Sequence, residues 1–246
     1  MDGKTLTTET QVVTEAFTEL APRYSDTMDL ELHQYWGISY QAFIALTLKL
    51  AEVKPGDLVL DIATGTASIP IAVKKNAKQD NILVGLDITP EMLKQGKKEI
   101  LERGAAEGTA LVCGSAMEMP FQDGVFQAAI CGLGTHHMNV PQMLSEAKRV
   151  LADGGRLIIA DVCATPFWRS TLGKIVLRVL LLQYGLSHRS ARSQAELEAF
   201  KNVRSVLEWE KLLRESGFRR VHIQELKPRR PWYPGGFALS SELKAW

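Results

Sequence analysis

The 246-residue chain has no long uninterrupted hydrophobic run and almost no excess of either charge. Its most apolar stretch, residues 174–186, contains Arg178 and is too short to span a bilayer. The 29 basic and 28 acidic residues leave a formal net charge of +1, which gives no general reason to expect nucleic acid as a partner. The first residues lack the basic and apolar segments of a secretory signal. We expect a cytoplasmic protein that is at most peripherally associated with membranes; its oligomeric state stays open.

Cysteine is also scarce. Cys113, Cys131 and Cys163 are far apart, and they form neither a CxxC pair nor a Cys/His pattern with the spacing of a metal site. We expect three buried thiols in a reducing compartment, and no metal.

Two common nucleotide-binding loops are missing as well. No GxxxxGK[ST] run is present, which excludes a Walker-type phosphate loop. The loop "DIATGTAS", residues 61–68, has Gly65 as its only glycine, so it lacks the GxGxxG pattern that lets a pyrophosphate approach a helix. This argues against a nicotinamide-dependent oxidoreductase.

What the chain does contain is a regular alternation of apolar strands and amphipathic helices. Such strands indicate a parallel sheet covered on both faces, with ligands outside the carboxyl ends of the strands. We therefore predict an α/β fold, doubly wound and Rossmann-like, with a mostly parallel seven-stranded sheet. The predicted strands are residues 58–63, 81–88, 109–114, 124–133 and 156–162, followed by an antiparallel pair at 219–226 and 235–243.

Helical segments flank this core. We predict a single domain, 1–246, with four parts: an N-terminal helical cap (1–54), a cofactor-binding core (55–164), a helical lid after the fifth strand (165–204), and a C-terminal helix with closing strands (205–246). Thr89 is expected to cap the helix of residues 89–104, and Ser205 with Glu208 forms a capping box. The lid has an apolar helix around residues 172–182, which we expect to wall a pocket for a hydrophobic substrate.

Two acids stand at the ends of adjacent strands. Asp61 lies within an apolar strand end, where a carboxylate must be paired or hydrogen-bonded. Asp87 ends the next strand, 22 residues beyond Gly65, at the place from which a carboxylate binds ribose hydroxyls. A cofactor with an amine and a ribose but no pyrophosphate describes S-adenosyl-L-methionine.

Four stretches in order, "VLDIATGTA", "VGLDITPEML", "CGSAMEMPFQDGVFQAAI" and "RVLADGGRLIIADV", resemble the class I S-adenosylmethionine-dependent methyltransferases. The opening segment "FTELAPRYSDTMDLELHQYWGISYQAFI" is similar to the ubiquinone/menaquinone biosynthesis C-methyltransferase family and its relatives. The resemblance implies a loop around the methionine portion, Asp87 on the ribose, and Ile88 and Met92 beside the adenosine. Ser115 stands where an Asp is common. The implied cofactor-binding residues are Tyr24, Asp61, Ala63, Thr64, Gly65, Thr66, Asp87, Ile88, Met92, Ser115, Ala116, Met117, Gly132 and Leu133.

His136 and His137 follow the fourth strand, in a loop that faces the reacting methyl group in this fold. Neutral histidine is the usual proton acceptor near pH 7, so either residue is a candidate general base. The pair also recurs in the family as a structural element, and that alternative stays open. We do not expect it to bind metal, because adjacent residues point apart and no third ligand has suitable spacing.

The resemblance implies S-adenosylmethionine-dependent methyl transfer to a small or lipidic acceptor, such as a quinone, a phenol or a similar secondary metabolite. The alternative is a protein of the same fold that binds the cofactor without methylating. The basic stretch 227–232 fits either an anionic head group or a solvated strand end.

Overall fold

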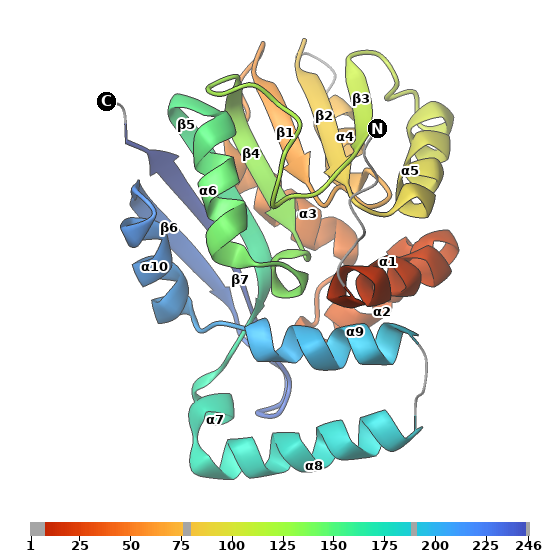
Figure 1. The fold of residues 1–246 in the computed structure, drawn as a ribbon, viewed down its shortest axis with the longest axis vertical. Coiled ribbons are helices and arrows are strands. Elements are labelled where there is room, and N and C mark those ends of the chain that lie inside the picture. The colour runs from red at the N-terminus through yellow and green to blue at the C-terminus, as the bar shows by residue number, and fades with distance from the viewer. Residues whose placement is uncertain (1–7, 76–79, 188–190, 245–246) are drawn as a thin grey trace.

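The computed structural model describes residues 8–75, 80–187 and 191–244. Its centre is one seven-stranded sheet in the order β3-β2-β1-β4-β5-β7-β6 (Figure 1). The first five strands are parallel, and β7 is antiparallel to both β5 and β6. The strands are β1 (Leu58–Ile62), β2 (Ile82–Asp87), β3 (Thr109–Cys113), β4 (Phe126–Gly132), β5 (Leu151–Cys163), β6 (Phe218–Leu226) and β7 (Gly235–Leu243). The predicted doubly wound sheet is confirmed.

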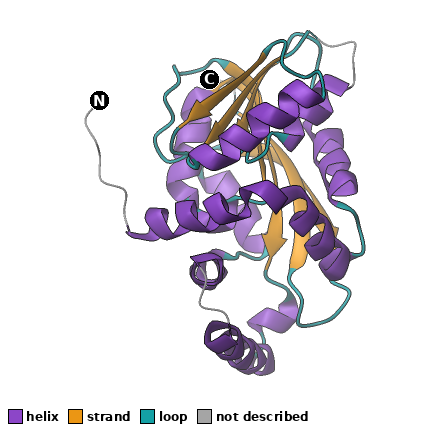
Figure 2. Ribbon diagram, turned by 90° about the vertical axis from the view of Figure 1, so that its right-hand side faces the viewer, coloured by secondary structure: helices purple, strands orange, loops and turns teal. Residues whose placement is uncertain are grey.

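Helices cover both faces of this sheet, as Figure 2 shows. The helices of the described residues are α1 (Thr8–Leu20), α2 (Tyr24–Trp36), α3 (Tyr40–Ala51), α4 (Ser68–Lys75), α5 (Pro90–Glu102), α6 (Val140–Val150), α7 (Pro166–Arg169), α8 (Thr171–Ser187), α9 (Ala191–Ala199) and α10 (Val206–Glu215), with 3-10 turns η1 (Ala21–Arg23), η2 (Thr135–His137) and η3 (Phe200–Asn202).

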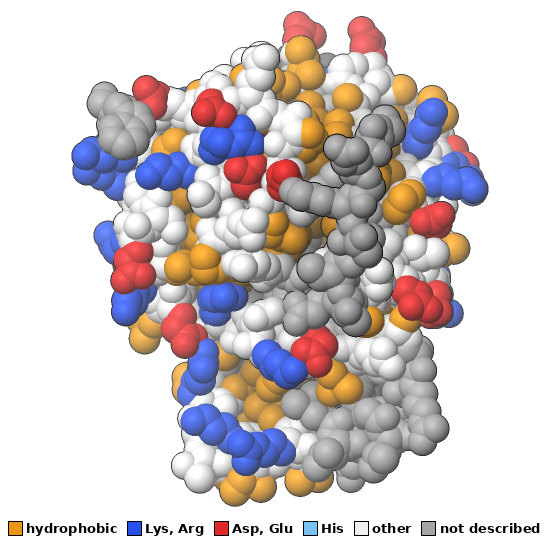
Figure 3. Space-filling view, in the orientation of Figure 1, with side chains coloured by type: hydrophobic (Ala, Val, Ile, Leu, Met, Phe, Trp, Pro, Cys, Tyr) orange, Lys and Arg blue, Asp and Glu red, His pale blue; other side chains and the backbone are white. Residues whose placement is uncertain are grey.

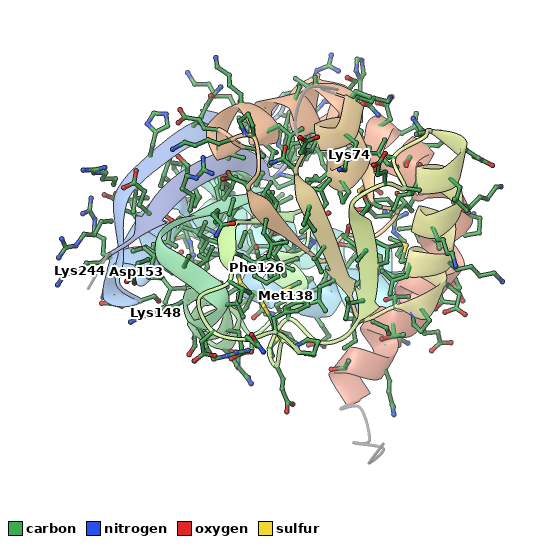
Figure 4. The ribbon with its side chains drawn as sticks, turned by 90° about the horizontal axis from the view of Figure 1, so that it is seen from above. Lys74, Phe126, Met138, Lys148, Asp153 and Lys244 are labelled. Atoms are coloured by element: carbon green, nitrogen blue, oxygen red, sulfur yellow. The ribbon has the colours of Figure 1, made fainter. Side chains whose placement is uncertain are left out.

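The two cores follow from the side-chain alternation along the strands. Val59 and Ile130 point to the face covered by α2, α3 and α4, whereas Leu60 and Cys131 point to the face covered by α6 and α10. Figure 4, seen from the amino ends of the parallel strands, shows Phe126 in the interior, and it is almost fully buried. Both faces are apolar because both are covered.

The sheet register brings three loops to one edge. Ile62, the last residue of β1, pairs with Leu86 in β2 and with Cys131 in β4. The segments that follow β1, β2 and β4 therefore leave the sheet side by side at its carboxyl edge. This edge carries the predicted cofactor residues.

The lid differs from its predicted arrangement. The helix that lies over the carboxyl edge is α9, which packs against α1 and η2. The apolar helix α8 packs against α7 and α9 and lies farther from the sheet (Figures 1 and 2). α9 therefore separates the described part of α8 from the strand ends, and a role for α8 in walling a substrate pocket stays a prediction.

Several local expectations are corrected. The side chain of Thr89 makes no capping hydrogen bond to α5. Cys113 is exposed, because β3 is an edge strand. The helix α6 ends at Val150, and β5 begins at once, with a shift in its register to β4. The capping box of Ser205 is present as predicted.

The basic segment 227–232 lies between β6 and β7, and its side chains are exposed except for the half-buried Pro228. The amide of Arg229 donates to the carbonyl of Tyr35 at 2.8 Å. Within the part of the chain that the structure describes, none of the helices has the length and apolar character that crossing a bilayer requires.

Candidate active site

The loop after β1 is built around Asp61. The hydroxyl of Thr64 donates to Asp61 Oδ2 at 2.6 Å, and the Thr64 amide donates to the carbonyl of Leu86 at 3.0 Å. These two bonds hold the loop against β2. Ala63, Gly65 and Ala67 all have left-handed backbone conformations, with φ of 56°, 53° and 60°. Only glycine adopts that conformation without a Cβ penalty, so the backbone is strained at Ala63 and Ala67.

The other carboxylate oxygen of Asp61 has no hydrogen-bond partner among the described residues, although it is buried. Burial, together with the charge of Asp87, raises the pKa of Asp61 to about 7, against the effect of the Thr64 hydrogen bond. A buried carboxylate with a free oxygen is destabilised unless a cation or donor reaches it. An ammonium group supplies both, so this orphaned oxygen fits the amino group of an amino-acid cofactor.

Asp87 joins the same loop to the next helix. Its Oδ2 accepts from the Gly65 amide at 2.9 Å, and its Oδ1 accepts from the Thr89 amide at 2.8 Å. Burial raises the pKa of this carboxyl, and the backbone donors partly offset that effect. Each oxygen keeps a second lone pair that can accept from a hydroxyl.

The loops after β1 and β4 pack closely around Gly65 and Gly134, where a side chain would contact neighbouring atoms. A Cβ on Gly65 would lie 3.1 Å from Met92 Cε and 3.9 Å from the Tyr24 ring. A Cβ on Gly134 would lie 2.9 Å from the Cβ of Ala63. Met92 and Tyr24 therefore come within contact distance of the loop, and their role in binding the cofactor stays a prediction.

Tyr24 is buried at the start of α2. Its ring stands edge-on to that of Tyr40, with centroids 6.1 Å apart. Burial raises the pKa of Tyr24 well above its ordinary value, and the neighbouring Tyr40, Asp87 and Asp161 raise it further. The hydroxyl is therefore neutral at physiological pH and can donate a hydrogen bond.

The remaining predicted cofactor residues also follow these strand ends. The Ser115 hydroxyl accepts from the Met117 amide at 3.2 Å and so forms a turn after β3. Ile88 and Met117 are half-buried, while Thr66 and Ala116 are buried. Gly132 ends β4, and Leu133 has a φ of 54°, the conformation that turns the chain toward η2.

His136 is held by a carboxylate that the sequence reasoning missed. Its Nδ1 lies 2.7 Å from Oδ1 of Asp161, which is fully buried in β5. Burial lowers the pKa of His136, but the charge and hydrogen bond of Asp161 outweigh it, so the pKa is raised. The same pairing keeps the pKa of Asp161 below its usual value despite burial. Asp161 also accepts from the amide of Thr135 at 2.8 Å and from its hydroxyl.

His137 has the opposite character. Burial, and then the charge of His136, lower its pKa well below the ordinary value. Its Nδ1 is buried and has no hydrogen-bond partner among the described residues. Its ring stands edge-on to Phe17 of α1, with centroids 5.1 Å apart. His137 is therefore a neutral imidazole with a nitrogen able to accept a proton.

The expectation that the two histidines point apart is wrong. Their ring centroids are 4.2 Å apart, because the 3-10 turn η2 curls the backbone tightly. Glu196 of α9 also joins them, with one potential ligand atom from each residue within 4.8 Å of the others. Arg192 competes for this acid, since its Nε lies 4.0 Å from Glu196 and its Nη2 pairs with Glu31.

Asp161 could have been predicted in the same way as Asp61, because it is also an acid inside an apolar strand, "RLIIADV". Glu196 had no such signal. It lies on a polar helix whose packing against the site depends on the tertiary structure.

Solved structures with this fold include methyltransferases. Geranyl diphosphate C-methyltransferase from Streptomyces coelicolor A3(2), solved with Mg²⁺, geranyl diphosphate and S-adenosyl-L-homocysteine, is 14% identical with a TM-score of 0.66, over 89% of this chain and 83% of that one. The [4+2]-cyclase SpnF is 14% identical with a TM-score of 0.71, over 98% of this chain and 97% of that one. The fold is thus the Rossmann-like α/β fold that these solved structures share.

The family follows from the sequence comparison. The model of the ubiE/COQ5 methyltransferase family matches residues 4–227, so the chain belongs to that family. The demethylmenaquinone methyltransferase of Symbiobacterium thermophilum is 30% identical over 65% of this chain and 62% of its own length. The ubiquinone/menaquinone biosynthesis C-methyltransferase UbiE of a Ruegeria species is 32% identical over 61% of this chain and 58% of its own length. The matches therefore cover less than two thirds of these two relatives.

Proposed function

We propose that the protein transfers a methyl group from S-adenosyl-L-methionine to a ring carbon of a quinol with a lipidic tail. The family and the names of its relatives support this acceptor class. The observation that carries the proposal is the buried, unpartnered oxygen of Asp61 beside a loop of small residues. A cytoplasmic location is part of the proposal, and the free cysteines fit it.

The chain's own residues divide the work of binding. Asp61 would pair with the ammonium group of the cofactor, and Asp87 would accept from the ribose hydroxyls. Ile88, Met92 and Met117 would line the adenosine, with Ser115 and Ala116 near its ring edge. Tyr24 would close over the cofactor. When bound, the sulfonium supplies an electrophilic methyl group, so alignment of the acceptor and exclusion of water are the protein's main tasks.

The two histidines have separate roles in this proposal. Neighbouring groups with pKa values pushed apart mark acid and base partners. His136, whose pKa is raised by its contact with Asp161, would in its protonated form donate a hydrogen bond to an acceptor oxygen. Neutral His137 would take the proton that the ring carbon loses when it gains the methyl group.

The test is product formation, separated from cofactor binding. Purified protein would be given labelled S-adenosyl-L-methionine with a panel of quinols, phenols and amines, and the products identified by mass spectrometry. Methylation of a quinol carbon supports the proposal. Tight cofactor binding without any product would replace it by the non-methylating alternative, and loss of binding in Asp87→Ala would locate the cofactor.

A further inference from the structure

The helix α8 lies at the end of the molecule opposite the amino ends of the parallel strands and packs against α7 and α9 (Figure 1). One face is turned inward, where Leu177 is buried together with Trp168. Another face is apolar and open. Leu172, Ile175 and Val179 are 65%, 54% and 49% exposed.

These three residues form a single stripe. Positions i, i+3 and i+7 lie on one side of a helix, and Leu177 falls on the other side. A helix that is apolar on two opposite faces needs a second apolar surface to cover the outer one.

Cationic side chains border this stripe. A cavity of about 230 Å³ beside α8 has a partly aromatic lining with a basic rim, as the blue and orange atoms at the lower end of Figure 3 show. Arg169 pairs with Glu208, and Lys201 pairs with Glu198. Lys174 and Arg178 have no ion-pair partner among the described residues. The lining residues are Ala164, Trp168, Arg169, Lys174, Leu177, Arg178, Phe200, Lys201 and Val203.

The loop between β6 and β7 adds an amphipathic anchor next to α7. Trp232 is 41% exposed, and its carbonyl accepts from the indole of Trp168 at 3.2 Å. The guanidinium of Arg230 lies over the Trp232 ring, 5.6 Å from its centroid. Tryptophan and arginine at the border of an apolar surface are typical of the bilayer interface.

We propose that this α8 surface, made of the exposed α8 stripe, the basic rim and Trp232, docks on a bilayer that contains anionic phospholipid. The stripe would enter the boundary between head groups and acyl chains, and Lys174 and Arg178 would meet lipid phosphates. Charge complementarity favours an anionic bilayer over a second copy of the chain. A symmetric dimer through α8 would bring the same cations of both copies together. The proposal goes beyond the proposed function, since it holds for any acceptor.

The experiment is co-sedimentation of the full chain with vesicles, without cofactor or acceptor. One set of vesicles is phosphatidylcholine, and in the other a part is replaced by phosphatidylglycerol. We expect binding to the second set that weakens as salt is added. The double variant K174Q/R178Q removes two surface charges and is expected to bind roughly thirty-fold more weakly. The variant I175Q/V179Q is expected to lose binding to both sets.

Two controls match these variants. Lys94→Gln with Lys97→Gln removes two exposed charges from α5, and Leu207→Gln replaces a leucine that is 77% exposed on α10. Both are expected to bind vesicles as the unaltered chain does. Equal sedimentation with neutral and anionic vesicles, or unchanged binding by K174Q/R178Q, would overturn the proposal. So would a dimer in solution that I175Q/V179Q converts to monomer, since α8 would then be its interface.

Discussion

His136 and Asp161 join the loop after β4 to the end of β5 through a 2.7 Å contact between Nδ1 and Oδ1. The acid is fully buried, and it also accepts from the backbone and hydroxyl of Thr135. The ion pair therefore fixes both the orientation of the imidazole and the shape of η2. Because Nδ1 of His136 contacts Asp161, Nε2 is the ring nitrogen that can bind a methyl acceptor.

Replacing Asp161 with Asn is expected to lower the pKa of His136 and to destabilise the fold. The Asn side chain would keep only one oxygen to accept hydrogen bonds, and its NH2 group would face the donors that now bind Asp161. We expect this to lower the free energy of unfolding by roughly 2–4 kcal/mol. The pKa shift is measured by NMR titration of the His136 imidazole in both proteins. An unchanged His136 titration would disprove the assigned role.

The pH dependence of this pair has a defined sign. Because the pKa of His136 is raised in the folded state, it stabilises the protein below pH 6.5, and this stabilisation is lost as the pH rises through the pKa of the folded state. Because the pKa of Asp161 is lowered in the folded state, it stabilises the protein above pH 3.8, and this stabilisation is lost as the pH falls through the pKa of the folded state. The stability difference between the unaltered chain and Asp161→Asn should therefore be larger at about pH 5.5 than at about pH 8.5 in urea unfolding.

The sheet could be predicted because its strands are short, apolar runs separated by helices with clear ends. Asp61 and Asp87 could be predicted because carboxylates at buried strand ends need a partner. The placement of α8 and α9 could not be predicted from the sequence. Both segments could be recognised as helices, but their spatial order depends on contacts between α9 and α1 that no local pattern encodes. The Arg192–Glu31 pair links residues far apart in sequence for the same reason.

A matched pair of substitutions tests the contact between the loops after β1 and β4. Gly134→Ala places a Cβ 2.9 Å from the Cβ of Ala63 and is expected to destabilise the protein by roughly 1–3 kcal/mol. Ala63→Gly removes that Cβ at a position with φ of 56°, which glycine adopts readily. The double variant should regain most of the stability and cofactor affinity in urea unfolding and calorimetry. Failure of the rescue would show that the loops do not meet there.

Cofactor binding is expected to release a proton from Asp61. The pKa of about 7 in the free protein means that ionisation must accompany pairing with an ammonium group. Affinity should fall about tenfold for each pH unit below that value, as calorimetry in buffers of different ionisation enthalpy would show. Asp61→Asn should flatten the profile and weaken binding, whereas Asp153→Asn, an exposed residue near the start of β5, should leave both unchanged.

The same pKa has a consequence for the free protein. Because the pKa of Asp61 is raised in the folded state, the folded protein loses stability as the pH rises from 3.8 toward 7, since this carboxyl ionises first in the unfolded chain. Asp61→Asn is therefore expected to unfold at a higher temperature than the unaltered chain at about pH 8, in the absence of cofactor. An equal or lower unfolding temperature would mean that Asp61 is already satisfied by another group.

The histidine–glutamate cluster is expected to work without metal, although its ligand atoms lie within 4.8 Å of one another. Arg192 already pairs with Glu31 and lies 4.0 Å from Glu196, so a divalent cation would have to displace a guanidinium. Methyl transfer should be unchanged after chelation with EDTA. Added Zn²⁺ should inhibit by capturing the neutral imidazole of His137, and Glu196→Gln should weaken that inhibition. Loss of activity on chelation, restored by one metal, would instead make the cluster a metal centre and remove His137 as the base.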